Sequence, residues 1–192
     1  MLTPPDGRPD GGNIRYLEKP ERWRQFDPPL FDHLQWMATD PSRRRVALIE
    51  ERDVIPGAKY ISETLSDVVS ERRAYFKLAH QTLSGAELVF FDPDIGLPVP
   101  STPKGRRNSA KFLYLDEIAA FYDSGHSVLV YQHFARVKRD KFITQKIEEL
   151  RQVAGKAAIQ PIITPHTAFL LAKNPRHPNL QLGPFPDPPL LR

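Results

Sequence analysis

The chain has 192 residues, a natural size for one α/β domain with a sizeable core. Its 40% hydrophobic and 26% charged residues are ordinary for a globular protein, and a formal net charge of +4 is too small to establish nucleic-acid binding. The absence of cysteine excludes disulfides and thiolate metal sites, and no apolar run reaches the roughly 18 to 20 residues that span a bilayer. We therefore expect a cytoplasmic protein without a membrane partner.

Residues 1–29 are rich in proline, glycine and charge, with turn signals at Asp6-Gly7 and Asp10-Gly11. They predict a terminal arm. A domain that begins in such a loop is unusual, because loops connect elements, so one interpretation is that an upstream helix and strand are missing. The equally simple alternative is a plain disordered arm.

Residues 30–173 predict one domain, and the proline-rich residues 174–192 predict a tail. Apolar spacing predicts helices over 30–37, 70–83, 116–122 and 138–153. Short apolar runs predict strands over 45–50, 58–61, 88–91, 127–131, 157–163 and 167–172.

From residue 88 onward the predicted elements alternate between strand and helix and finish in two consecutive strands. This order indicates parallel βαβ units that end in an antiparallel pair. The expected fold is therefore α/β, a three-layer Rossmann-like and mostly parallel sheet with an antiparallel C-terminal edge pair. Its first strand is absent under the first interpretation of the arm.

Two predicted strands end in polar residues. Asp92-Pro93-Asp94 follows the apolar run 88–91, which suits a strand covered on both faces, and Gln132-His133 follows the run 127–131. The carboxyl ends of parallel strands share one crevice, where open α/β sheets bind ligands. We therefore predict catalytic roles for Asp92, Asp94 and His133, and a substrate contact for Gln132.

The loop between these strands adds cations at the same end of the sheet. Lys111 precedes an aromatic residue and is a candidate for binding phosphate or pairing with Asp92 or Asp94. Arg106 is a candidate substrate contact, although flexible surface charge is its simplest interpretation. Glu50 ends the predicted strand 45–50, where nucleotide-binding folds place an acid on a ribose hydroxyl, so it is a candidate cofactor contact.

Three motifs resemble those of a little-characterised family of bacterial and phage proteins. They are Phe91-Asp-Pro-Asp-Ile-Gly-Leu97, Ser109-Ala-Lys-Phe-Leu-Tyr-Leu-Asp-Glu-Ile118 and Val130-Tyr-Gln-His133. The family's strand-end motif usually reads Asp-Pro-Asp-Asn-Gly, so Ile95 departs from it. The resemblance covers residues 10–172 and implies a longer N-terminal region, but it implies no activity.

The order of elements also resembles the second half of a class I methyltransferase, in particular the enzymes that methylate adenine amino groups in ribosomal RNA. In those enzymes an Asp-Pro-Pro-aromatic motif holds the target amine. Asp92-Pro93 matches its first half, which implies a substrate contact at Pro93, and Asp94-Ile95 does not match its second half. The resemblance implies S-adenosylmethionine as cofactor, and Gly11 and Gly12 lie about where its binding loop is expected.

Three functions follow as hypotheses. The first is a methyltransferase-like protein that acts on nucleic acid or a nucleotide, with Asp92 accepting a hydrogen bond from the target amine. The second is a Mg²⁺-dependent nuclease or phosphoesterase in which Asp92 and Asp94 bind the metal and Lys111 binds phosphate. The third is a catalytically inactive, phage- or defence-associated binding protein. The oligomeric state is left open.

Overall fold

The computed structural model describes residues 1, 3, 14–155 and 157–180. The chain divides into two compact units, a helical unit within residues 5–62 and a sheet unit that comprises residues 1–4 and 63–192. The division therefore falls between Ser62 and Glu63, whereas the composition of the sequence predicted a boundary after residue 29. No helix in the described parts of the chain is long and apolar enough to cross a bilayer.

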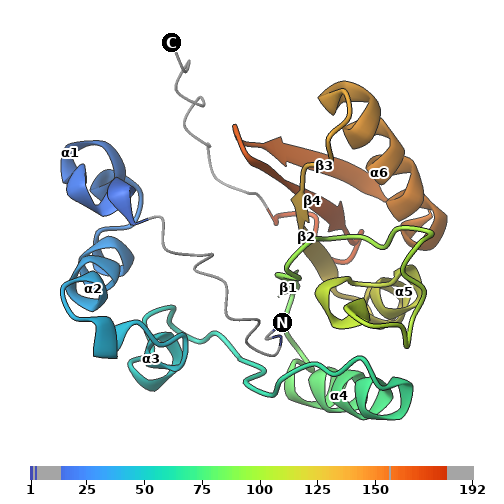
Figure 1. Ribbon diagram of the computed structural model, residues 1–192, viewed down its shortest axis with the longest axis horizontal. Helices are drawn as coiled ribbons and strands as arrows, with labels where there is room; N and C mark the ends of the chain where they lie inside the picture. Colours follow the sequence, from blue (N-terminus) through green and yellow to red (C-terminus); the bar gives the residue numbers. More distant parts are fainter. Residues whose placement is uncertain (2, 4–13, 156, 181–192) are drawn as a thin grey trace. The chain divides into compact units, whose positions relative to one another are not determined.

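The helical unit is built from short helices (Figure 1). Their bounds are η1 Arg15–Glu18, α1 Pro20–Trp23, η2 Arg24–Phe26, α2 Pro28–Ala38, η3 Pro41–Arg43 and α3 Ala47–Glu51. The predicted helix over 30–37 is confirmed as α2. Asp27 caps this helix by accepting a hydrogen bond from the Leu30 amide at 3.0 Å. Its small core contains Leu17, Phe31, Met37 and Leu48.

Two strand predictions in this unit are wrong. The run 45–50 overlaps α3, with Leu48 buried and Val46 exposed, and residues 58–61 belong to no helix or strand. A short apolar run is compatible with either a strand or a helix. A helix satisfies its backbone hydrogen bonds within itself, whereas a strand needs a partner.

The described residues of the sheet unit form three longer helices, one short turn and four strands. Their bounds are α4 Val69–Thr82, β1 Leu88–Phe91, η4 Ser109–Lys111, α5 Leu115–Asp123, β2 Ser127–His133, α6 Arg139–Ala154, β3 Ala158–Ile163 and β4 Thr167–Lys173. Each was predicted to within a few residues, apart from η4. The element types in this unit therefore followed from local sequence periodicity.

The sheet has the order β1-β2-β4-β3. Strands β1 and β2 are parallel, and β4 is antiparallel to both β2 and β3. The predicted antiparallel pair is confirmed, but β4 lies inside the sheet and β3 forms the edge. The prediction of a mostly parallel sheet is therefore wrong, although the α/β class is confirmed.

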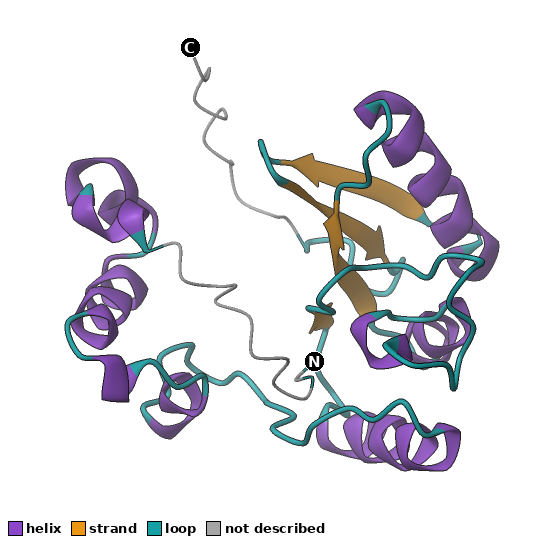
Figure 2. Ribbon diagram, viewed as in Figure 1, coloured by secondary structure: helices purple, strands orange, loops and turns teal. Residues whose placement is uncertain are grey.

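One face of the sheet carries the core, and Figure 2 shows α5 and α6 on one side of the strands. Its fully buried side chains include Val128, Val130, Leu170 and Ala172. On β1 only alternate residues are buried, and Phe90 is 49% exposed. The expectation that β1 is covered on both faces is therefore wrong, and the three-layer arrangement is not confirmed.

Candidate functional site

The segment after β1 is held between two other parts of the sheet unit. The Ile95 amide donates to the Lys111 carbonyl at 3.0 Å, and the Ile95 carbonyl accepts from the His133 amide at 2.8 Å. The Leu113 amide donates to the Gly96 carbonyl at 2.9 Å. Residues 92–97 are thereby fixed to the end of β2 on one side and to the segment around Lys111 on the other.

Gln132 secures the same segment from within. Its side chain is 2% exposed, and its oxygen accepts from the Leu97 amide at 2.9 Å. Its nitrogen donates to the carbonyls of Ile95 at 3.2 Å and His133 at 2.9 Å. The Gln132 amide, which was predicted to contact substrate, is therefore hydrogen-bonded to backbone groups and holds residues 95–97 in place.

Asp92, Pro93 and Asp94 line an open depression of about 440 Å³, together with Tyr131 of β2 and with Met1 and Thr3. This depression is hereafter the cleft. Its volume lies in the range of small-molecule sites, which is about 300 to 1,000 Å³. The predicted strand-end location is thus a concave surface that presents two carboxylates and one phenol.

The two carboxylates have different surroundings. Both Asp94 oxygens accept from the Thr3 hydroxyl, at 3.0 and 3.2 Å, and the Lys111 ammonium lies 3.4 Å from Asp94. Burial raises the pKa of Asp92, and repulsion by Asp94 acts in the same direction against the attraction of the Met1 ammonium. Asp92 thus has the Met1 ammonium as its charged neighbour, whereas Asp94 has the Lys111 ammonium and the Thr3 hydroxyl.

Tyr131 was not predicted as a site residue. Burial raises the pKa of its phenol, and Asp92 and Asp94 raise it further. Its ring packs edge-on against Phe169 at 5.7 Å between centroids, and Phe169 lies 6.1 Å from Phe90. The cleft thus adjoins a partly exposed aromatic surface on the sheet face opposite the core.

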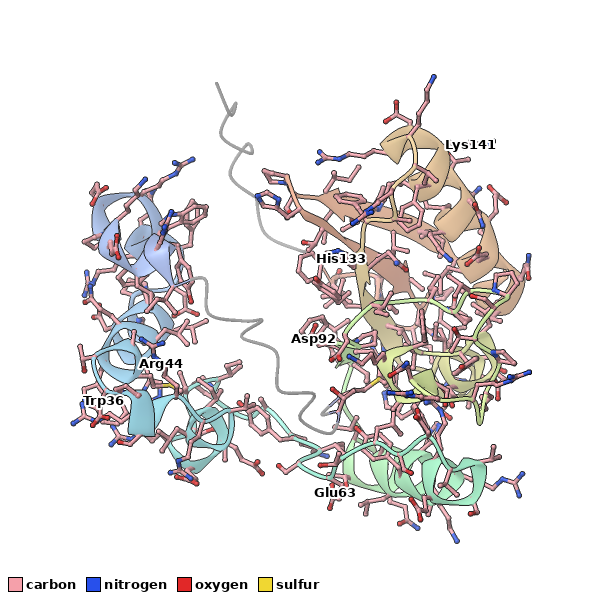
Figure 3. All side chains as sticks on the ribbon, in the orientation of Figure 1. Trp36, Arg44, Glu63, Asp92, His133 and Lys141 are labelled. Atoms are coloured by element: carbon pink, nitrogen blue, oxygen red, sulfur yellow. The ribbon has the colours of Figure 1, made fainter. Side chains whose placement is uncertain are left out.

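His133 lies on the same strand as Tyr131 but outside the cleft. Phe91 pairs with Val130, so Asp92 continues beside Tyr131, and His133 lies two residues farther along β2. Figure 3 shows the labelled Asp92 and His133 at these strand ends. The imidazole is exposed and is not among the residues that line the cleft.

The remaining predicted residues do not gather at the cleft. Arg106 is exposed in the loop, where its amide donates to the Pro103 carbonyl. Glu50 lies on α3 of the helical unit and accepts from the Ser62 hydroxyl at 2.6 Å, so its predicted place at a strand end is wrong. Gly11 and Gly12 lie outside the described residues.

The described residues provide little of a cofactor or metal site. Of the residues predicted to hold S-adenosylmethionine, only Glu50 is described, and its hydrogen bond to Ser62 does not suggest a ribose site. No three histidine, aspartate or glutamate side chains are grouped to hold a metal ion in the described ranges. Asp92 and Asp94 alone would leave most of the coordination of a Mg²⁺ ion to water or substrate.

A buried ion pair was also missed. Arg72 of α4 is 1% exposed and donates to both carboxylate oxygens of Glu117 of α5, at 2.5 and 2.8 Å. The sequence predicted no role for Arg72, and Glu117 entered only as part of the motif that begins at Ser109. The two residues are 45 positions apart, so no local spacing signals their contact.

Searches against protein-family models, curated proteins and solved structures found no match to this chain.

Proposed function

We propose that the sheet unit belongs to a methyltransferase-like protein and that its cleft holds an exocyclic amino group of a nucleobase, in nucleic acid or in a nucleotide. The observation that carries the proposal is the shared cleft of Asp92 and Tyr131 at the ends of two parallel strands. A carboxylate accepts hydrogen bonds from an amine, and an aromatic ring supports a base by stacking.

The chemistry of Asp92 favours this ligand. A partly desolvated carboxylate gains more from a new N–H donor than a fully hydrated one does. Asp94 has the Thr3 hydroxyl and Lys111 as partners, and Asp92 is attracted by the Met1 ammonium but lies beside the Tyr131 ring, so we assign the amine to Asp92. Asp92 therefore orients the amine and stabilises positive charge that develops on its nitrogen.

Tyr131 compensates for a departure from the resembled motif. Where those methyltransferases have an aromatic residue after the strand, this chain has Asp94-Ile95. Tyr131 of the neighbouring strand β2 lines the same cleft, and its aromatic ring provides a stacking surface. The methyl donor, which the resemblance implies to be S-adenosylmethionine, is assigned no residues in the described parts of the chain.

The test is a set of binding measurements with matched ligands. Adenosine and inosine differ at the position of the exocyclic amine, so adenosine should raise the melting temperature and inosine should not. Asp92→Asn should abolish the response, because the amide presents one acceptor without the charge. Equal responses to both nucleosides, or an unchanged response in the variant, would refute amine recognition at Asp92.

The second candidate function is a Mg²⁺-dependent phosphoesterase, which the pairing of two carboxylates with Lys111 supports. The same assay includes Mg²⁺ and Mn²⁺ alone and S-adenosylmethionine alone. A melting shift with metal that Asp94→Asn removes, without any response to adenosine, would favour the phosphoesterase. A response to S-adenosylmethionine would favour methyl transfer.

A further inference from the structure

The sequence motif that begins at Ser109 forms a turn beside the cleft. Residues 109–112 form the short turn η4 and its cap, and the side chains of Ser109, Ala110 and Phe112 are buried. Lys111 is the residue of this turn whose side chain contacts a residue that lines the cleft, since its ammonium lies 3.4 Å from Asp94. The motif thus presents one cation on a buried support.

Two charged side chains hold the backbone of this turn from inside the unit. The Arg72 guanidinium donates to the Ser109 carbonyl at 3.0 Å and to the Phe112 carbonyl at 2.7 Å. The Asp67 carboxylate accepts from the amides of Asn108 at 2.8 Å and Ala110 at 2.6 Å. The residues on both sides of Lys111 are therefore fixed by ionised groups, which form stronger hydrogen bonds than neutral ones.

Arginine is suited to this position because its guanidinium has donors along several edges of one plane. One edge binds both oxygens of Glu117, while the remaining donors reach the two carbonyls of the turn. Glu117 also accepts from the Tyr114 amide at 2.9 Å, at the start of α5. A lysine at position 72 would keep the charge but would lack this geometry.

The turn is joined directly to residues 92–97, hereafter the cleft segment. The Lys111 carbonyl accepts from the Ile95 amide, the residue next to Asp94. A lysine side chain loses about 1.5 to 2 kcal/mol of rotamer entropy when it is held in one place. Fixing the backbone on both sides of Lys111 limits the further entropy that must be lost when its ammonium pairs with Asp94.

We infer that Arg72 is a positioning residue for the cleft, which with Glu117 and Asp67 holds the turn 108–112 so that Lys111 contacts Asp94. The inference rests on the proposed function for the meaning of the cleft, but the contact itself can be tested without any ligand. Its failure and the failure of amine recognition are therefore distinguishable.

The test is zero-length cross-linking with a water-soluble carbodiimide, followed by peptide mass spectrometry. The reagent joins a lysine amine to a carboxylate in contact with it, forms an amide and takes up the water as a urea. The Lys111–Asp94 product is measured relative to a control product within α6, Lys146–Glu149, whose charged atoms lie 2.7 Å apart. A general loosening of the fold lowers both products.

In Arg72→Met we expect the Lys111–Asp94 product to fall about fivefold relative to the control product, which corresponds to about 1 kcal/mol of regained freedom. Arg72→Lys should be intermediate, and the exposed neighbour Arg73→Met should behave as the wild type. If Arg72→Met does not fold, Asp67→Asn should show the same selective loss. An unchanged ratio in a folded variant would overturn the inference.

Discussion

The side-chain amide of Gln132 packs directly against Gly96. A β-carbon added to Gly96 would lie 2.5 Å from three atoms of this amide, which is too close for contact. Gly96 also has a φ of +127°, which L-residues with side chains rarely adopt. Close approach and backbone conformation thus both require glycine at the residue that follows Ile95 in the cleft segment.

Gly96→Ala should therefore lower the free energy of unfolding by about 2 to 4 kcal/mol, from backbone strain and overpacking together. The measurement is urea denaturation of the full chain. Gly85→Ala is the matched control, since Gly85 has a φ of +80° but no atom within 4 Å of its added carbon, and it should cost only about 1 kcal/mol from strain. Equal losses would mean that Gln132 yields to the added methyl group.

The ion pair between Arg72 and Glu117 should be strongly coupled. Both side chains are buried, and removing Arg72 leaves the Glu117 carboxylate with the partly exposed Lys104 ammonium at 3.1 Å as its charged partner. Arg72→Met should cost about 3 to 5 kcal/mol in unfolding free energy, and Arg72→Met with Glu117→Leu should cost less than the sum of the single changes. The control is Arg151→Met, which breaks an exposed pair with Glu148 and should cost about 1 kcal/mol or less. Additive losses in the double variant would contradict the coupling.

The elements of the sheet unit were predictable because their signals are local. Four apolar runs gave the strands, and a strand that ends in Asp92-Pro93-Asp94 indicated the cleft. Strand order is not local, since it depends on where β4 pairs after the turn that follows β3. One sequence signal bears on it: Pro161 of β3 cannot donate to a neighbouring strand, which favours an edge position for β3 and leaves the apolar β4 for the interior of the sheet.

The site residues that were missed depend on long-range geometry. Tyr131 was assigned to a buried strand, and its place in the cleft follows only from the register with β1 and from which sheet face carries helices. Gln132 and His133 were predicted together, yet the alternation of side chains along β2 buries one and exposes the other. Glu50 was misplaced because its apolar run formed a helix.

Ionisation of Asp92 should lower the free energy of unfolding as pH rises. Its pKa is raised in the folded protein, first by burial, so above the ordinary value of 3.8 the folded state binds more protons than the unfolded chain. The contribution of Asp92 to the free energy of unfolding therefore falls as pH rises through this window and stays lower above it. Asp92→Asn removes the effect and should be more stable than the wild type at pH 7.

The comparison is made by urea denaturation of both proteins at pH 7 and again near pH 3.5. At the lower pH the carboxyl is mostly protonated in both states, so the advantage of Asp92→Asn should shrink. A constant difference between the proteins would show that packing or hydrogen bonding, and not ionisation, sets it. A carboxylate kept at a position where it lowers stability is what a binding or catalytic role predicts.

Tyr131 should contribute to ligand binding through its ring. Stacking of a base on an aromatic side chain is worth about 1 to 3 kcal/mol, so Tyr131→Ala should weaken adenosine binding about tenfold or more in isothermal titration calorimetry. Tyr131→Phe keeps the ring and should remain within a few-fold of the wild type. Phe90→Ala is the matched control, because Phe90 is exposed on the same sheet face but is not among the residues that line the cleft. If Phe90→Ala weakens binding as much as Tyr131→Ala does, the base lies on the wider aromatic surface and not in the cleft beside Asp92.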